Sequence, residues 1–243
     1  MTNKFSAIFV LLLSVMFHFD GALAAEKIYL SSGIRDPFTT INKDGFIDQI
    51  VREAFSRIGV DAEVIVYQNS AKSLSNANSG IDDGAALRIK GIDKKFTNLV
   101  IVPEKLMDND FIAYSLGMNK MVSDWKSLEK YKITHIEGWQ IFKNNTKNHP
   151  NVTLVKTPQE MFDSLSQLEI DVILYERWQG LWRAKEMGLK VKSHEPPLAS
   201  VEMFMYLNNK HKDKAIPVAT ALAQMKKDGT YERIYNQTLA ILK

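Results

Sequence analysis

Residues 44–67 read DGFIDQIVREAFSRIGVDAEVIVY, and this stretch contains the repeating unit of the fold. Its first half places apolar residues three and four positions apart, which predicts one buried face of an amphipathic helix over 46–58. Gly59 then ends the helix, and the β-branched run at 64–66 predicts a strand. A helix, a short turn and a buried strand in succession are typical of α/β proteins with mainly parallel sheets.

The same alternation of strands and helices continues along the rest of the chain. It runs to about residue 102 and restarts near residue 119, so the chain contains two similar β/α sets rather than one long one. The patterns predict strands at 27–30, 62–67, 85–89, 99–102, 131–136, 152–155, 171–175 and 201–207 and helices at 46–58, 74–77, 125–128, 157–168, 177–187, 217–225 and 231–242.

Two β/α sets predict an α/β fold of two lobes with mainly parallel sheets. We assign residues 25–115 and 205–243 to lobe one and residues 116–204 to lobe two. Two extended crossings, near 111–118 and 198–207, would join the lobes. Ligands of open α/β sheets bind beyond the carboxyl ends of the strands, so we expect a ligand cleft between the lobes. Two crossings permit the lobes to close as a hinge.

The first residues predict export from the cytoplasm. Lys4 precedes an apolar run over 5–17, and the small-x-small sequence Ala22-Leu23-Ala24 follows. This is the three-part pattern of a secretory signal peptide, so we expect residues 1–24 to be removed and the protein to be periplasmic. The alternative is an uncleaved membrane anchor, but the run is shorter than the roughly 20 residues that a spanning helix needs.

Composition and motifs argue against several classes of function. The net charge of +3 among 243 residues does not suggest a nucleic-acid partner, and the absence of cysteine excludes disulfides and a thiol nucleophile. The sequence contains no His-Glu-x-x-His spacing, no G-x-S-x-G elbow and no phosphate-binding glycine loop. We therefore expect no metal, no cofactor and no catalytic residues, and a monomer that binds a small molecule.

Three motifs resemble those of the extracellular solute-binding proteins of family 3, the periplasmic amino-acid-binding type. They are SGID at 79–82, DVILYER at 171–177, and a C-terminal signature that starts at Lys212 and includes ALAQMKKDGTYERI at 221–234. The resemblance covers nearly all of the chain after the signal peptide. One step departs from the family pattern, because the place of its Thr-x-x-Arg reads GIDK at 91–94 and Arg88 stands a few residues earlier.

The resemblance implies a type II periplasmic-binding-protein fold and a function in transport. The protein would capture a small polar ligand, an amino acid or related carboxylate, and deliver it by hinge closure to the permease of an ABC importer. Two alternatives remain open. The protein could be an orphan or sensory binding protein that presents its ligand to a membrane receptor. It could also be an enzyme on the same fold, such as a periplasmic dehydratase, with an acid–base pair in the cleft.

Arg88 is the strongest candidate for a ligand contact. It interrupts the apolar strand over 85–89, and a guanidinium matches a carboxylate with two parallel hydrogen bonds. The alternative is a structural ion pair with Asp82, Asp83 or Asp93. The family resemblance suggests Glu176 as the acid that meets a ligand ammonium group, whereas its position before a helix also fits a carboxylate favoured by the helix dipole.

The remaining candidates surround these two charges. Gly138 follows the 131–136 strand, and backbone N–H groups in such a turn can bind a carboxylate. Trp139, Tyr175 and Phe38 could stack on the ligand, or could belong to the core. Lys72 is a weaker candidate for a second anion contact, and a solvated surface lysine is the alternative.

Overall fold

The computed structural model describes residues 27–117 and 119–243, and the predicted signal peptide lies outside the described residues. Within these ranges no helix combines the length and the apolar content needed to cross a membrane. The strands are β1 (Lys27–Ser32), β2 (Asp61–Val66), β3 (Gly84–Ile89), β4 (Leu99–Ile101), β5 (Met107–Leu116), β6 (Ile133–Ile136), β7 (Val152–Val155), β8 (Val172–Glu176), β9 (Val191–Ser193) and β10 (Ala199–Asn208). The α-helices are α1 (Phe46–Ser56), α2 (Ser70–Ser79), α3 (Gln140–Thr146), α4 (Pro158–Ser166), α5 (Arg177–Glu186), α6 (Ala215–Lys227) and α7 (Thr230–Thr238).

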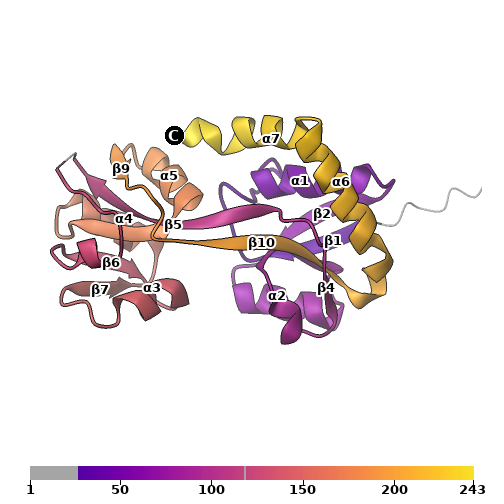
Figure 1. The fold of residues 1–243 in the computed structure, drawn as a ribbon, viewed down its shortest axis with the longest axis horizontal. Helices are drawn as coiled ribbons and strands as arrows, with labels where there is room; N and C mark the ends of the chain where they lie inside the picture. The colour runs from indigo at the N-terminus through magenta and orange to yellow at the C-terminus, as the bar shows by residue number, and fades with distance from the viewer. Residues whose placement is uncertain (1–26, 118) are drawn as a thin grey trace, which may run out of the picture.

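The strands form two lobes that share one continuous hydrogen-bonded sheet, in the order β2-β1-β3-β10-β5-β8-β6-β7. In lobe one, β1 pairs with β2 and β3 in parallel. In lobe two, β6 pairs with β7 and β8 in parallel. The long strands β5 and β10 pair with each other and with the lobe strands in antiparallel fashion, and they run side by side between the lobes (Figure 1).

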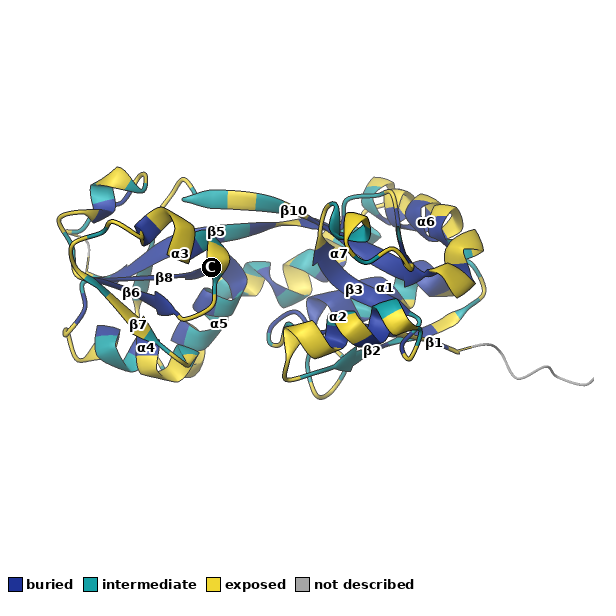
Figure 2. Ribbon diagram, turned by 90° about the horizontal axis from the view of Figure 1, so that it is seen from below, coloured by how far each residue is buried: buried dark blue, intermediate teal, exposed yellow. Residues whose placement is uncertain are grey.

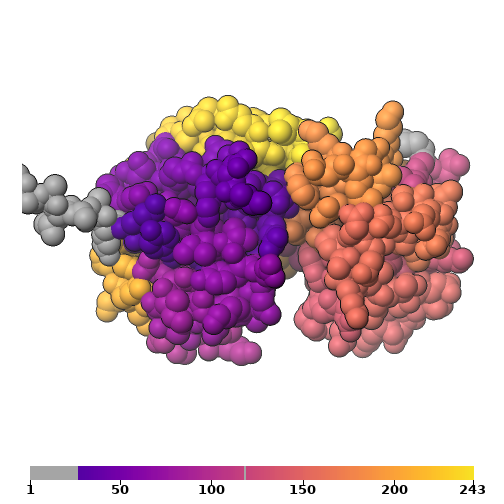
Figure 3. Space-filling view, turned by 180° about the vertical axis from the view of Figure 1, so that it is seen from behind, coloured from indigo at the N-terminus to yellow at the C-terminus, as the bar shows by residue number. Residues whose placement is uncertain are grey.

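This architecture confirms the predicted two-lobed α/β fold, with β5 and β10 as its two crossings. The residue boundaries that we assign to the lobes remain a prediction. Figure 3 shows the space-filled surface hollowed between the two lobes.

The central strands of each lobe are largely buried (Figure 2). Apolar clusters lie on both faces of the sheet in each lobe. In lobe one, α1, α6 and α7 cover one face and α2 packs on the other. In lobe two, alternate residues of β5 point to opposite sides: Phe111 and Ala113 belong to one cluster, and Ile112 and Tyr114 to another. Such alternation is the period-two geometry of a strand buried on both faces.

Several elements differ from the sequence prediction, and three of them show why. Helix α3 was not predicted, because its sequence QIFKNNT has two adjacent apolar residues and no period that marks a face. Strand β9 was not predicted either, since its three residues gain their strand geometry from pairing with β5. The last predicted helix, over 231–242, divides into α7 and a short 3₁₀ turn at Ala240–Leu242.

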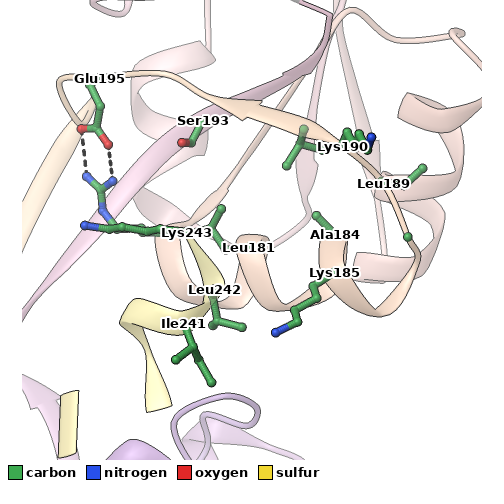
Figure 4. Close-up of a pocket in the computed structure, with 13 residues that line it drawn as sticks. Leu181, Ala184, Lys185, Leu189, Lys190, Ser193, Glu195, Ile241, Leu242 and Lys243 are labelled. Carbon is green, nitrogen blue, oxygen red and sulfur yellow. Dashed lines mark hydrogen bonds and ion pairs between the residues drawn. The ribbon is translucent and has the colours of Figure 1, made fainter. Parts of the chain in front are cut away.

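Arg177, the first residue of α5, ties the two crossings together. Its Nε donates to Oδ2 of Asp110 on β5 at 3.0 Å. Its terminal nitrogens donate to both carboxylate oxygens of Glu195, which precedes β10, as the dashed lines in Figure 4 mark. Asp110 also accepts a hydrogen bond from the hydroxyl of Ser200 on β10 at 2.7 Å. This cluster fixes the position of α5 against both strands that connect the lobes.

Glu195→Gln should lower the free energy of unfolding by about 1 kcal/mol, as measured by urea denaturation at pH 7. The loss is modest because the Glu195 side chain is 54% exposed, so water screens the pair, and Arg177 keeps its bond to Asp110. Glu129→Gln, at an exposed position outside this cluster, is the control and should change stability by less than about 0.5 kcal/mol. Equal effects of the two substitutions would contradict a stabilising role for the Arg177 cluster.

Candidate ligand-binding site

Two adjoining hollows lie between the lobes, with volumes of about 390 and 580 Å³. They share Gly33 from lobe one and Trp139 and Gln179 from lobe two. Together they form one cleft whose walls come from both lobes and from the crossings. Hollows of this size are typical of sites for small molecules. We call this the interlobe cleft.

The lobe-one wall of the interlobe cleft combines polar side chains with two isoleucines, Ile34 and Ile89. Arg35 and Asp36 lie in the turn after β1, and Gln68 precedes α2. Ser70 is the first residue of α2 and is exposed to the cleft. The polar part of this wall, with charges of both signs, suits a ligand that carries polar or charged groups.

The lobe-two wall combines aromatic rings with amides and one cation. It consists of Ile136, Gly138, Trp139, Gln140, Ile141, Asn144, Pro158, Tyr175, Gln179, Trp182 and Arg183. The Arg183 guanidinium lies 5.1 Å from the ring centroid of Trp182, and the rings of Trp139 and Tyr175 are 5.0 Å apart. Aromatic faces with a few convergent polar groups are the usual lining of a small-molecule pocket.

Asn109 adds a polar atom at the crossing between the lobes. The residue is 8% exposed and lines the cleft from β5. Its Oδ1 has no hydrogen-bond partner among the residues that the structure describes. A buried oxygen without a donor is unfavourable, so this atom is suited to accept a hydrogen bond from a ligand.

Three residues predicted from the sequence line the interlobe cleft. Gly138, Trp139 and Tyr175 all contribute to the lobe-two wall. Gly138 has a φ of +87°, a left-handed conformation that glycine adopts without strain. Burial raises the pKa of the Tyr175 hydroxyl above its usual value, so the group is neutral and can donate a hydrogen bond. Their roles as ligand contacts remain a prediction.

Arg88 lies behind the lobe-one wall rather than in it. Its side chain is 9% exposed and its guanidinium contacts two serines of α2, Ser70 and Ser73. Burial lowers the pKa of Arg88 to about 10, so it stays charged at neutral pH. Among the described residues it forms no ion pair with a carboxylate, so the predicted alternative of a pair with Asp82, Asp83 or Asp93 does not occur in this structure.

Glu176 caps the N-terminus of α5. Its Oε2 accepts a hydrogen bond from the backbone N–H of Gln179 at 2.8 Å, which is the helix-start role that the sequence also suggested. The carboxyl is 1% exposed and is not part of the cleft lining. Burial raises its pKa to about 8, and its Oε1 has no partner among the described residues. Contact with a ligand would require the α5 N-terminus to shift.

Phe38 and Lys72 are not brought into the cleft lining. Phe38 is 0% exposed and packs in the core of lobe one, which is the core alternative stated above for the aromatic candidates. Lys72 is an exposed residue in the first turn of α2. Neither residue is among those that line the interlobe cleft, and their roles as ligand contacts stay predictions.

Several lining residues were missed from the sequence. Gln179 and Arg183 are four positions apart on α5, so they share one helix face directly after Tyr175, and this spacing was a usable signal. Arg35 and Ser70 gave no local signal, because each lies in or beside a turn and reaches the cleft through the packing of lobe one.

A third hollow, of about 740 Å³, has a different location (Figure 4). It lies between α5, β9 and the last residues of the chain and shares no residue with the interlobe cleft. Its lining mixes apolar side chains with polar and charged ones, including Arg177, Glu195 and three lysines. Its lining combines α5 and β9 of lobe two with residues 241–243, which lie in the segment that we assign to lobe one.

The fold and the cleft define a two-lobed ligand-binding architecture, and solved structures share it. No protein-family model matches the chain. An ancestral cationic amino-acid solute-binding protein superposes with a TM-score of 0.71 at 17% identity, covering 88% of this chain and 95% of that chain. The second substrate-binding domain of a putative amino-acid ABC transporter from Streptococcus pneumoniae gives 0.70 at 16% identity, covering 88% and 100%.

Two further proteins are similar to this chain, one in structure and one in sequence. The sensor domain of a histidine kinase, described as similar to periplasmic binding proteins, gives a TM-score of 0.69 at 14% identity and covers 88% of this chain and 96% of that chain. An uncharacterised protein of Shewanella oneidensis is 23% identical over 194 residues, which cover 73% of this chain and 69% of that protein. These similarities establish the periplasmic-binding-protein fold for the chain, in agreement with the sequence resemblance.

Proposed function

We propose that the protein is a periplasmic solute-binding protein that captures an amino acid or a related small carboxylate for an ABC importer. The observation that carries this proposal is the interlobe cleft, which residues of both lobes line together. A ligand that touches both walls binds more tightly to the closed arrangement and shifts the population towards it. The importer would recognise that closed shape.

The chemistry of the cleft supports a ligand with both donor and acceptor groups. Arg35 and Arg183 place positive charge on opposite walls, and Oδ1 of Asn109, which has no partner in the described part of the chain, can accept a hydrogen bond. Trp139 and Trp182 provide apolar surface for the rest of the molecule. Export, supported by the signal-peptide pattern over 1–24, would place this cleft in the periplasm.

A sensory role is the second candidate, because a histidine-kinase sensor domain shares the fold. Both roles require ligand binding and closure, so binding is tested first. Native mass spectrometry of the exported protein should reveal a co-purified small molecule, and amino acids and dicarboxylates should be tested by thermal shift. A ligand at 100 times its dissociation constant stabilises the protein by about 2.7 kcal/mol. Chemical conversion of the bound molecule would instead support an enzyme.

Trp139→Ala should weaken binding of the ligand found in this way by at least about tenfold, because the ring lies where the two halves of the cleft meet. The measurement is the dissociation constant by isothermal titration calorimetry. Trp125→Ala is the matched control. Trp125 and Trp139 both pack against Phe142, but Trp125 does not line the cleft, so its loss should leave affinity unchanged. Equal affinities for the two variants would place the ligand elsewhere.

A further inference from the structure

Within residues 27–117 and 119–243, Arg88 is a buried cation that pairs with no carboxylate. Its Nη1 donates to Oγ of Ser70 at 2.7 Å, and its Nη2 donates to the Ser70 carbonyl at 3.1 Å and to Oγ of Ser73 at 2.7 Å. Its Nε has no partner among the described residues. By contrast, Arg57 and Arg177 each contact two carboxylates. Hydroxyls and a carbonyl solvate the Arg88 charge but do not neutralise it, and an unpaired buried charge is costly.

Ser70 connects this buried charge to the interlobe cleft. It is exposed, it lines the larger hollow, and it opens the ten-residue helix α2. A serine hydroxyl has one hydrogen to donate and can accept two hydrogen bonds. Because the Ser70 oxygen accepts from Arg88, its own hydrogen must point away from the guanidinium. The hydroxyl can therefore donate into the cleft.

The start of α2 is otherwise favourable for an anion. The first N–H groups of a helix have no acceptor within the helix, and they carry the positive end of the helix dipole. Asn69 occupies one of them, the N–H of Lys72. Gly33 packs so closely against Ser70 that a Cβ there would lie 2.5 Å from the Ser70 Cα, which fixes the position of the helix start at the cleft wall.

We propose that the Ser70 hydroxyl is the lobe-one contact for an anionic group of the ligand, and that Arg88 is a positioning residue that supplies positive charge from behind it. An oxygen bonded to Ser70 would lie within about 5 Å of the guanidinium, since two hydrogen bonds of ordinary length separate them. The ligand class is therefore a small carboxylate. This inference rests on the proposed solute-binding function, and it replaces the direct Arg88–ligand contact expected from the sequence.

The test compares acids with their amides on the full exported chain. The probes are L-amino acids with their α-carboxamides, and succinate with succinamide, titrated by calorimetry. The wild-type protein should bind the acid at least tenfold more tightly than the amide. Ser70→Ala should weaken binding of the acid about tenfold and binding of the amide less, because a hydrogen bond to a charged acceptor is stronger than one to a neutral acceptor. Ser70→Thr keeps the hydroxyl and should retain affinity within about threefold.

The controls separate this inference from the proposed function. Ser75→Ala alters an exposed serine of the same helix outside the cleft and should bind like the wild type. If acids bind Ser70→Ala as tightly as the wild type while Trp139→Ala binds weakly, the inference fails and the function stands. If no acid binds the wild-type protein, both fail. Arg88→Gln should lose the preference for acids, and Arg88→Lys should keep it. The quantity measured is the ratio of the dissociation constants for amide and acid, which would not change if Arg88 were merely structural.

Discussion

Gly84→Ala should lower the midpoint of thermal unfolding by about 6–12 °C, the shift expected for a loss of about 3 kcal/mol in a chain of this size. A Cβ at this position would lie 2.2 Å from the backbone oxygen of Tyr206 and 2.9 Å from Cδ2 of Leu30. Gly84 begins β3, and it pairs with Leu30 of β1 on one side and Leu207 of β10 on the other. With strands on both sides, neither backbone can move away.

Thr153→Ala on the exposed strand β7 is the control for Gly84→Ala. It changes a strand residue that has free space around it, so its effect should stay within about 0.5 kcal/mol. A Gly84→Ala protein that unfolds at the wild-type temperature would mean that β3 and β10 are not packed as described. That result would also weaken the argument for the Ser70 and Arg88 contact, because Arg88 lies on the same strand as Gly84.

The fold was predictable where local sequence patterns and tertiary packing agree. The apolar period of α1 predicted its buried face, on which Ile47, Ile50, Val51 and Phe55 are all buried. Thr157 accepts a hydrogen bond from the N–H of Glu160 and caps α4 at the residue where the predicted helix over 157–168 begins. Helix α3 lacks both signals and forms through the packing of Phe142 in lobe two. Elements of that kind depend on contacts far apart in the sequence.

The site was predictable only in part, because burial can be inferred from a sequence pattern more readily than the identity of a partner. An arginine inside an apolar strand suggested that Arg88 is buried, and it is. Its partners lie on α2, 15 and 18 positions away, and only the packing of that helix against β3 brings Ser70 and Ser73 to it. For Glu176, the sequence allowed two roles and the structure shows the helix cap.

Glu176→Gln should abolish a loss of stability that the wild-type protein shows between about pH 5 and pH 8. Burial raises the pKa of this carboxyl from 4.5 to about 8, and the nearby charge of Asp110 adds to the shift. In this window the unfolded chain releases the proton while the folded chain keeps it. The folded state therefore binds more protons than the unfolded state in this window. The free energy of unfolding is highest, as far as this carboxyl is concerned, below pH 4.5, and it falls as the pH rises above that value. The loss is on the order of 4 kcal/mol.

Urea denaturation at pH 5, 6, 7 and 8 measures this effect, with Glu186→Gln at an exposed position of the same helix as the control. Asp228, whose pKa is lowered to about 2 by Arg57, loses its contribution only below about pH 4 and does not interfere. Burial lowers the pKa values of His135 and His194, which adds stability as the pH rises towards 6.5, so the effect of Glu176 is taken as the difference between the wild-type and Glu176→Gln proteins. A difference that does not change from pH 5 to 8 would mean that Glu176 is hydrated or paired. If the carboxyl is neutral at pH 7, it offers no standing charge to a ligand ammonium group, and a cation that binds there must displace a proton.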